Sequence, residues 1–253
     1  MKISILMLTY NAPEYVLESI IGVNEARKRT ENLELVVLDN NSEPPTKELL
    51  QRLKEDHLID VLVLNPRNDL FAKGNNLASQ YARKDATHYL LLNSDIKVCD
   101  PECFNKLIEI HPKEGGISSL GAVISEPIRA DGYCLLIDKY LYDKYRLDES
   151  FEWWWSITKL QSQVLAEGLK IRAVKNHEKY LHHYGGKSGD AWKGASGMDI
   201  KIDEVMNWFS DKKGNVEIVE MLGTSIFTIG NAFNRWKRII GKMLRIIGFR
   251  SKY

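Results

Sequence analysis

The chain has 253 residues, of which 44% are apolar and 27% charged, and its formal net charge is +1 at pH 7. This length and composition suit one sizeable α/β domain or two small ones, and the near-zero charge argues against a general nucleic-acid binder. There is no uninterrupted apolar run of about 18 residues, so we expect no membrane-spanning helix.

The cysteines and the N-terminal residues predict the compartment. Cys99, Cys103 and Cys134 form an odd set without a paired framework, which indicates free thiols in a reducing environment. The start, MKISILMLTYN, turns polar too early for a signal peptide. We therefore expect a cytoplasmic protein.

Apolar runs of strand length alternate with helical spacing through the first part of the chain. The runs predict strands at 3–8, 33–38, 59–64 and 88–92, helices at 14–27, 46–54 and 75–83, and a loop at 68–74. Because the strands are apolar throughout, the pattern predicts a mostly parallel sheet with helices on both faces.

Polar residues follow three of these strands directly. TYN follows the first strand, DNNS the second and NSD the fourth. Ligands bind at the carboxyl edge of an open α/β sheet, so three clusters on that edge favour a ligand site. The alternative is that these residues only form turns and cap helices.

Four segments carry a family resemblance. ISILMLTYN, LVVLDNNS, NDLFAKGNN and YLLLNSDI resemble, in order and spacing, the nucleotide-sugar-binding half of family 2 glycosyltransferases of the GT-A fold, nearest the rhamnosyltransferase-like branch. A weaker match continues through DGYCLLIDKYLYDKYRLDESF and EGLKI to HHYGGKS. The resemblance implies a Rossmann-like sheet with a donor-binding half at 1–98, an acceptor-binding half at 99–195, and a C-terminal helical, basic amphipathic tail at 196–253.

The same resemblance implies a set of donor-binding residues. By position they are Thr9, Asn11, Asp39, Asn41, Lys73, Gly74, Asn76 and Asn93. Asp39 would bind the base or ribose, since carboxylates accept well-oriented hydrogen bonds. Lys73 would either contact a phosphate or be solvated, and Gly74 would permit close backbone approach.

Asn93-Ser94-Asp95 occupies the place of the family's D-x-D element. The resemblance implies that Asp95 binds Mn²⁺ or Mg²⁺, which would neutralise the leaving diphosphate. The alternative is that NSD only caps the next segment. His182 and His183 match the family's late histidine segment near the phosphates or metal, and the sequence leaves open which one points inward.

The family's general base is missing. Aligned on DE at 148–149 and on Gly168, its Glu-Asp pair falls on Ser156 and Ile157. Glu152 would lie one helical turn earlier and is the first substitute, followed by Asp148, Glu149 and Asp131. The chain could also use chemistry without this base, such as a retaining mechanism, or be a degenerate protein that binds without turnover.

The three consecutive tryptophans at 153–155 cannot share one face, because successive helical residues point roughly 100° apart. We expect at least one of them in the core, and one on the floor of an acceptor-sugar site.

The C-terminal part is basic. After Glu220 there are seven basic residues and no acidic one. Segment 226–253 predicts one or two amphipathic helices that contact an anionic membrane surface on its inner face, or pack on the domain.

The sequence thus predicts a metal-dependent, inverting glycosyltransferase. Its donor would be a UDP-, dTDP- or GDP-linked sugar, and its acceptor a hydroxyl of a glycan or lipid-linked glycan. The alternative is a catalytically degenerate nucleotide-sugar- or glycan-binding module on the same fold. A sugar nucleotidyltransferase is disfavoured, because no glycine-rich basic loop follows the first strand.

Overall fold

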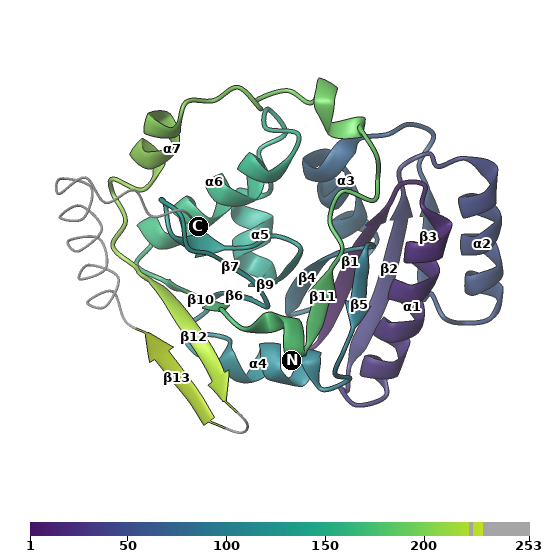
Figure 1. Cartoon of the computed structure of the whole chain (residues 1–253), viewed down its shortest axis with the longest axis horizontal. Helices are drawn as coiled ribbons and strands as arrows, with labels where there is room; N and C mark the ends of the chain where they lie inside the picture. The colour runs from purple at the N-terminus through teal and green to yellow at the C-terminus, as the bar shows by residue number, and fades with distance from the viewer. Residues whose placement is uncertain (223–224, 230–253) are drawn as a thin grey trace, which may run out of the picture.

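The computed structural model describes residues 1–222 and 225–229, which form an α/β fold (Figure 1). Strands and helices alternate through the N-terminal half, as the apolar pattern predicts. The elements in chain order are β1 (Ile3–Thr9), α1 (Pro13–Arg27), β2 (Leu33–Asp39), α2 (Pro44–Glu55), β3 (Val61–Leu64), α3 (Leu70–Ala78), β4 (His88–Asn93), β5 (Ile96–Val98), α4 (Cys103–Ile110), β6 (Gly116–Ser119), β7 (Ala122–Val123), β8 (Arg129–Ala130), β9 (Cys134–Asp138), α5 (Lys139–Tyr145), α6 (Trp154–Ala166), β10 (Lys170–Val174), β11 (Leu181–His183), α7 (Ile202–Trp208), β12 (Val216–Leu222) and β13 (Ser225–Ile229).

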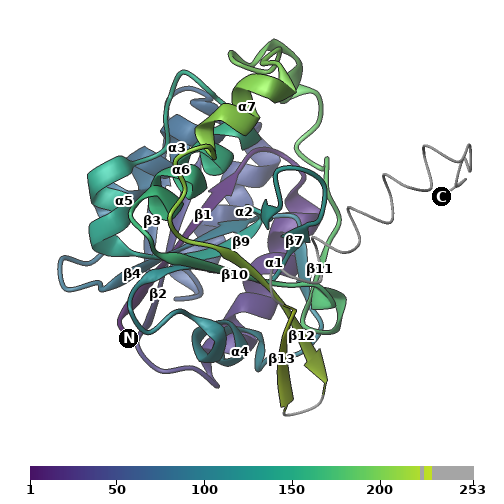
Figure 2. The same ribbon diagram turned by 90° about the vertical axis from the view of Figure 1, so that its left-hand side faces the viewer.

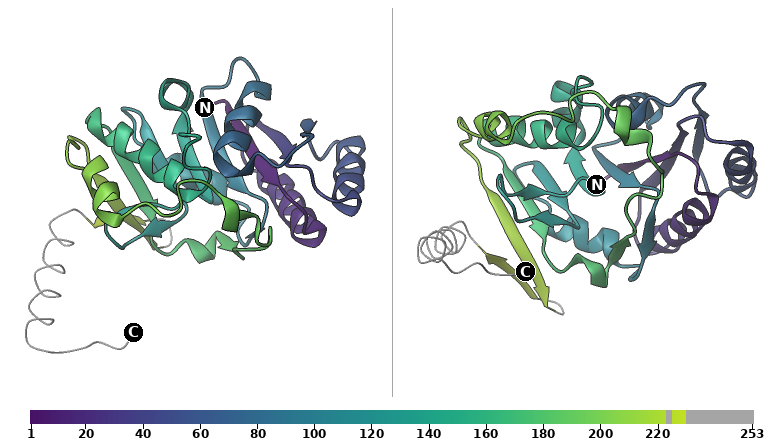
Figure 3. Two further views of the ribbon diagram at one scale, coloured as in Figure 1. Left: turned by 90° about the horizontal axis from the view of Figure 1, so that it is seen from above. Right: turned by 45° about the horizontal axis from the view of Figure 1, so that its top comes forward.

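Within the described residues, nine strands form one sheet in the order β13-β12-β10-β6-β9-β4-β1-β2-β3. β9 runs antiparallel to β4 and β6, and β13 runs antiparallel to β12, while the other neighbours are parallel. Figure 3 shows the early strands at one side of the molecule and the late strands at the other. The predicted mostly parallel sheet is confirmed.

Helices cover both faces of the sheet (Figures 1 and 2). Successive strand residues point to opposite faces, so Ile5 packs with α1, α2 and α4, while Leu6 packs with α3, α5, α6 and α7. The chain therefore folds as three layers with one hydrophobic core on each side of the sheet.

The register aligns the carboxyl ends of three strands. Thr9 at the end of β1 pairs with Asp39 at the end of β2, and Leu8 pairs with Asn93 at the end of β4. TYN, DNNS and NSD consequently emerge on one edge of the sheet, as expected from the sequence.

A small second sheet brings a distant segment to this edge. β5 pairs antiparallel with β11, and Ile96 lies opposite His183. The Ser19 hydroxyl of α1 accepts a hydrogen bond from the backbone N–H of Ile96 (3.0 Å) and lies 2.7 Å from the Ser94 carbonyl. The turn that contains Asn93-Ser94-Asp95 is thus fixed against α1.

The start of α3 differs from the expectation. Residues 68–74 were expected to form a loop and 75–83 a helix, but the helix begins at Leu70 and ends at Ala78. The backbone carbonyl of Glu152 accepts hydrogen bonds from the N–H groups of Phe71 (3.1 Å) and Ala72 (3.2 Å). These donors at a helix start need such a partner, and a segment distant in sequence supplies it.

The C-terminal part also differs. The wholly helical segment expected after residue 196 is wrong for 216–222 and 225–229, where β12 pairs with β10 and β13 pairs with β12. The remainder of the expected tail, 230–253, lies outside the described residues. Among the described helices, none has the length and apolar character needed to cross a membrane.

Candidate active site

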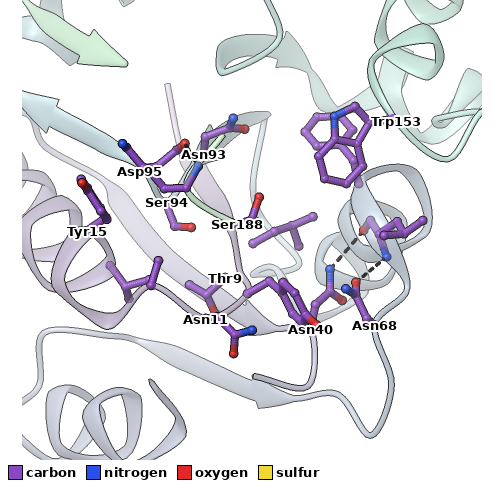
Figure 4. Close-up of a pocket in the computed structure, with 17 residues that line it drawn as sticks. Thr9, Asn11, Tyr15, Asn40, Asn68, Asn93, Ser94, Asp95, Trp153 and Ser188 are labelled. Carbon is purple, nitrogen blue, oxygen red and sulfur yellow. Dashed lines mark hydrogen bonds between the residues drawn. The ribbon is translucent and has the colours of Figure 1, made fainter. Parts of the chain in front are cut away.

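A cavity with about 610 Å³ of empty space, including its open mouth, lies at the carboxyl ends of β1 and β4. Figure 4 shows Asp95 and Trp153 on opposite sides of this first cavity. Its walls are formed by Leu8, Thr9, Tyr10, Asn11, Ala12, Tyr15, Val16, Asn40, Asn68, Leu70, Phe71, Asn93, Ser94, Asp95, Trp153, Lys187 and Ser188. The predicted residues Thr9, Asn11, Asn93 and Asp95 are therefore brought together.

Asp39 lies behind the wall of this cavity. It is fully buried, and its Oδ1 accepts a hydrogen bond from Thr9 Oγ1 at 3.1 Å. Its carboxylate also accepts hydrogen bonds from the Ser42 backbone N–H (3.0 Å) and hydroxyl. Asp39 thus holds Thr9 and the turn after β2, and a direct contact with a nucleotide would require this turn to open.

Asn40, which the sequence reasoning missed, lines the cavity in place of Asn41. Its amide donates to the Leu70 carbonyl at 3.1 Å, which connects the end of β2 to the start of α3 (Figure 4). Asn41 is exposed in the left-handed conformation (φ 62°) and bonds Lys47. The amide side chain that faces the cavity is therefore that of Asn40, one residue before the predicted Asn41.

Three predicted residues of α3 do not line the cavity. Lys73 forms an ion pair with Asp69, at 3.3 Å between Nζ and Oδ1. A Cβ on Gly74 would lie 3.0 Å from Leu8 Cδ1, so this glycine permits close packing of α3 on β1. The Asn76 side chain is buried and bonds Leu147, Tyr142 and Glu149, which leaves it saturated by protein partners.

Asp95 and His183 form the polar centre of the site. His183 Nε2 lies 3.2 Å from Asp95 Oδ1 and 3.2 Å from Asn93 Nδ2, and the His183 ring stacks on Tyr133 with centroids 4.5 Å apart. His182 is exposed and contacts Tyr184 instead. Because side chains alternate along β11, His183 is the histidine that points inward.

The electrostatics favour an ionised Asp95. Burial alone would raise the pKa of its carboxyl group, but the hydrogen bond and electrostatic attraction to His183, with the Lys187 backbone N–H at 3.5 Å, outweigh it and lower the pKa. A partly buried carboxylate beside an imidazole nitrogen is a donor set that a divalent cation accepts.

The loop after β11 closes one side of the first cavity. Lys187 and Ser188 line it, and Lys187 Nζ lies 5.1 Å from the Tyr15 ring centroid. Lys187 is thus the cation that the structure places at the cavity, where the sequence reasoning considered Lys73. The signal available in the sequence was the Gly-Gly-Lys-Ser run itself.

A second cavity of about 530 Å³ adjoins the first. The two share Phe71, Asn93 and Trp153 in their walls. The remaining walls of the second cavity are Asp131, Gly132, Tyr133, Trp154, Ile157 and His183. Aromatic rings therefore surround a space in which Asp131 contributes the carboxylate.

The tryptophans divide among three environments. Trp153 lines both cavities, Trp154 lines the second and is 46% exposed, and Trp155 packs against the core beneath α6. One ring lies against the core, as expected. The ring placed to form a floor between the two cavities is Trp153.

The remaining candidate bases lie outside both cavity walls. Glu152 precedes α6, which begins at Trp154, and its carboxylate accepts a hydrogen bond from the Ser196 backbone N–H at 2.6 Å. Asp148 pairs with Lys159, at 2.5 Å between Oδ2 and Nζ, and Glu149 accepts a hydrogen bond from Asn76. Although burial opposes it, the pairing with Lys159 and Ser150 lowers the pKa of Asp148. The expected placement of Glu152 one turn before Ser156 on the same helix is wrong.

Solved structures share this architecture. A mannosyltransferase, PcManGT from Pyrobaculum calidifontis in complex with GDP-Man and Mn²⁺, aligns with a TM-score of 0.59 and 15% identity over 70% of this chain and 55% of that chain. S. aureus TarS 1–349 in complex with UDP-GlcNAc aligns with a TM-score of 0.58 and 14% identity over 83% and 71%. GalNAc-T7 with UDP, GalNAc and Mn²⁺ gives 0.57 and 14% over 68% and 42%.

These similarities concern the fold, which is that of GT-A glycosyltransferases. This chain spans little more than half the length of the mannosyltransferase. None of the curated protein sequences compared with the chain matches it. The sequence profile described as "Glycosyl transferase family 2" matches residues 4–174, which cover both cavities apart from the segment after β10. The chain belongs to glycosyl transferase family 2.

Proposed function

We propose that this glycosyltransferase moves a sugar from a nucleoside-diphosphate donor to a hydroxyl of a glycan or lipid-linked glycan. The observation that carries the proposal is the pair of adjoining cavities, the first with Asp95 and Lys187 in its wall and the second with Asp131, which meet at Asn93, Phe71 and Trp153. A transferase needs two substrates in contact at the reacting carbon, and two cavities with a shared wall suit that need.

The first cavity suits the donor. The backbone and side chains at the ends of β1 and β2 offer hydrogen-bonding groups to a nucleoside, and Lys187 offers a cation to the diphosphate. Structures of similar fold carry GDP-mannose or UDP-N-acetylglucosamine. A UDP-, dTDP- or GDP-linked hexose or deoxyhexose stays our prediction, and so does membership of the rhamnosyltransferase-like branch.

Asp95 and His183 would hold a divalent cation, Mn²⁺ or Mg²⁺. The fit rests on the 3.2 Å approach of the Asp95 carboxylate, in the wall of the first cavity, to the imidazole nitrogen of His183, in the wall of the second. When bound, such a cation neutralises charge on the leaving diphosphate. Lys187 adds positive charge on the same side, which favours departure of the nucleoside diphosphate.

The second cavity suits the acceptor, because the faces of Trp153 and Trp154 can pack against the C–H surface of a sugar ring. Asp131 is the carboxylate in this wall, and we assign to it the general base. It would take the proton of the acceptor hydroxyl as the oxygen bonds the anomeric carbon and the carbon–phosphate-oxygen bond breaks. Attack opposite the leaving diphosphate inverts the configuration.

A binding module without turnover is the second candidate. Ser156 and Ile157 stand where the family pattern has its acidic pair, and this observation favours a protein that binds a nucleotide sugar without transferring it. The two candidates differ in whether donor is consumed.

A screen of nucleotide sugars with Mn²⁺ tests both candidates, with binding measured by calorimetry and turnover by released nucleoside diphosphate. We expect one donor to be hydrolysed or transferred, and Asp95→Ala to abolish the Mn²⁺-dependent part of binding. Asn41→Ala, at an exposed residue outside the cavity walls, is the control. Binding without turnover of any donor would favour the module, and unchanged binding by Asp95→Ala would refute the metal role.

A further inference from the structure

Two histidines and an aspartate converge at the far end of the sheet from both cavities. His88 begins β4, Asp138 ends the antiparallel β9 beside it, and His111 follows α4. His88 Nε2 lies 3.4 Å from Asp138 Oδ1, and His111 Nε2 lies 3.1 Å from Asp138 Oδ2. One ligand atom from each of the three residues lies within 4.8 Å of the others.

Hydrogen bonds fix the orientation of His111. Its Nδ1 lies 3.0 Å from Ser118 Oγ, and that hydroxyl donates its own hydrogen to the Leu107 carbonyl at 3.2 Å. Ser118 therefore accepts from the Nδ1–H of His111. A neutral His111 then carries a lone pair on Nε2, directed at the Asp138 carboxylate.

His88 repeats this arrangement with a different hydroxyl. Its Nδ1 lies 2.8 Å from Thr87 Oγ1, and Thr87 Oγ1 donates to the Lys2 carbonyl at 3.1 Å. The Nε2 lone pair of a neutral His88 consequently also faces Asp138. The carboxylate itself is oriented by the Gly116 backbone N–H, which donates to Oδ2 at 2.7 Å.

In this tautomer two nitrogen lone pairs and a carboxylate face one another, and they repel unless a positive charge lies between them. Protons on both Nε2 atoms would supply that charge, but the His111 side chain is only 1% exposed, and burying an imidazolium is costly. A divalent cation supplies the positive charge while both imidazole rings stay neutral. Ligands around tetrahedral zinc lie about 3.3 Å apart at bond lengths near 2.0 Å. His88 Nε2 lies at this separation from one Asp138 oxygen and His111 Nε2 from the other, so a small shift of one imidazole brings both to the same ligating oxygen.

We propose that His88, His111 and Asp138 bind a Zn²⁺ ion that joins β4, β9 and the segment after α4. Thr87 and Ser118 act as the outer partners that hold the imidazoles in the ligating tautomer, the usual arrangement around zinc-bound histidine. Water completes the coordination from the side of Asp138, whose side chain is 15% exposed.

This site is separate from the proposed donor cation. His88 and Asn93 are the two ends of β4, and at a rise of about 3.3 Å per residue they lie roughly 17 Å apart. The proposal therefore does not depend on the proposed function, and removing Asp95 leaves it intact.

The test is a zinc titration of chelator-treated Asp95→Ala protein by calorimetry, with Co²⁺ absorption as a second readout. We expect one zinc ion per chain, and the visible absorption of four-coordinate cobalt. In the same background Ser118→Ala, which keeps all three ligands, should weaken zinc about 10- to 100-fold. Ser119→Ala is the matched control, because the neighbouring Ser119 hydroxyl donates to the Asp131 carbonyl and not to the cluster.

Two outcomes would overturn the proposal, and neither needs a variant in which a zinc ligand is removed. Absence of zinc binding in the Asp95→Ala protein would overturn the proposal, leaving a cluster in which the two imidazoles donate hydrogen bonds to Asp138. Equal zinc affinities of the Ser118→Ala and Ser119→Ala proteins would also overturn it, because binding would then occur elsewhere.

Discussion

Asp131→Asn is the substitution that separates the proposed chemistry from substrate binding. Asparagine keeps the size of the side chain and its packing beside Gly121 but cannot accept the proton of an acceptor hydroxyl. Loss of a general base costs about 10²- to 10⁴-fold in rate. This corresponds to about 2.7–5.5 kcal/mol of activation free energy at about 1.36 kcal/mol per tenfold change.

The two cavities predict how the loss divides between binding and turnover. Asp131 lines the second cavity and not the first, so the affinity for nucleoside diphosphate and Mn²⁺ should stay within a few-fold of wild type. The assay is sugar transfer at saturating donor, with donor affinity measured separately by calorimetry. We expect kcat to fall and donor affinity to remain.

Glu152→Gln is the matched control, since it makes the same carboxylate-to-amide change on a residue outside both walls. Its carboxylate accepts one backbone hydrogen bond from Ser196, and an amide oxygen can accept that bond as well. Transfer by Glu152→Gln should therefore stay within a few-fold of wild type. A wild-type rate for Asp131→Asn, or a hundredfold loss for Glu152→Gln, would refute the assignment.

The other predictions concern stability, the aromatic wall and the tail. Asn76→Ala should destabilise the fold by about 3 kcal/mol in urea denaturation, because it leaves several buried hydrogen-bonding groups without partners. Glu217 on β12 is partly buried, which alone would raise its pKa, but bonds to Arg172 and Lys170 on β10 lower the pKa below its usual range. A depressed folded-state pKa stabilises the fold above the unfolded-state pKa of about 4.3, so the advantage of wild type over Glu217→Gln, up to about 1 kcal/mol, should be present at pH 7 and vanish as acid titrates Glu217. Trp154→Ala should raise the acceptor KM without changing donor affinity, whereas Trp153→Ala should weaken both substrates, because only Trp153 lines both cavities. Removal of 230–253, which preserves β13, should abolish sedimentation with anionic liposomes, and continued sedimentation would reject the basic tail as the membrane contact.

The donor edge of the fold could be predicted because its signals are local. Apolar runs that end in TYN, DNNS and NSD define where β1, β2 and β4 stop, and parallel pairing then places those ends together. The sequence could not distinguish Asn40 from Asn41, since that choice depends on a left-handed turn residue. It also could not assign Asn76, whose partners at 142–149 are distant in the sequence.

The strand β12 could have been predicted from the sequence, but the basic composition of the residues that follow it led to the expectation of helices. VEIVEML at 216–222 is a short run rich in β-branched residues that follows Gly214 and Asn215, and its length and composition favour a strand although its acidic residues do not alternate with period two. The His88–His111–Asp138 cluster had no such signal, because its members are separated by more than twenty residues and meet only through the pairing of β4 with β9 and the return of the chain after α4.

Asp131 lies next to the position at which the family pattern has its acidic pair. Ile157, at the family's acidic position, lines the second cavity, and a Cβ on Gly132 would approach within 3.0 Å of Ile157 Cγ2. Because Gly132 has no side chain, the loop before β9 packs directly against α6 and places the Asp131 carboxylate in the same wall as Ile157. A carboxylate at this location can therefore come from either of two elements that touch. We therefore assign the proposed base from the wall of the second cavity rather than from the aligned position on α6.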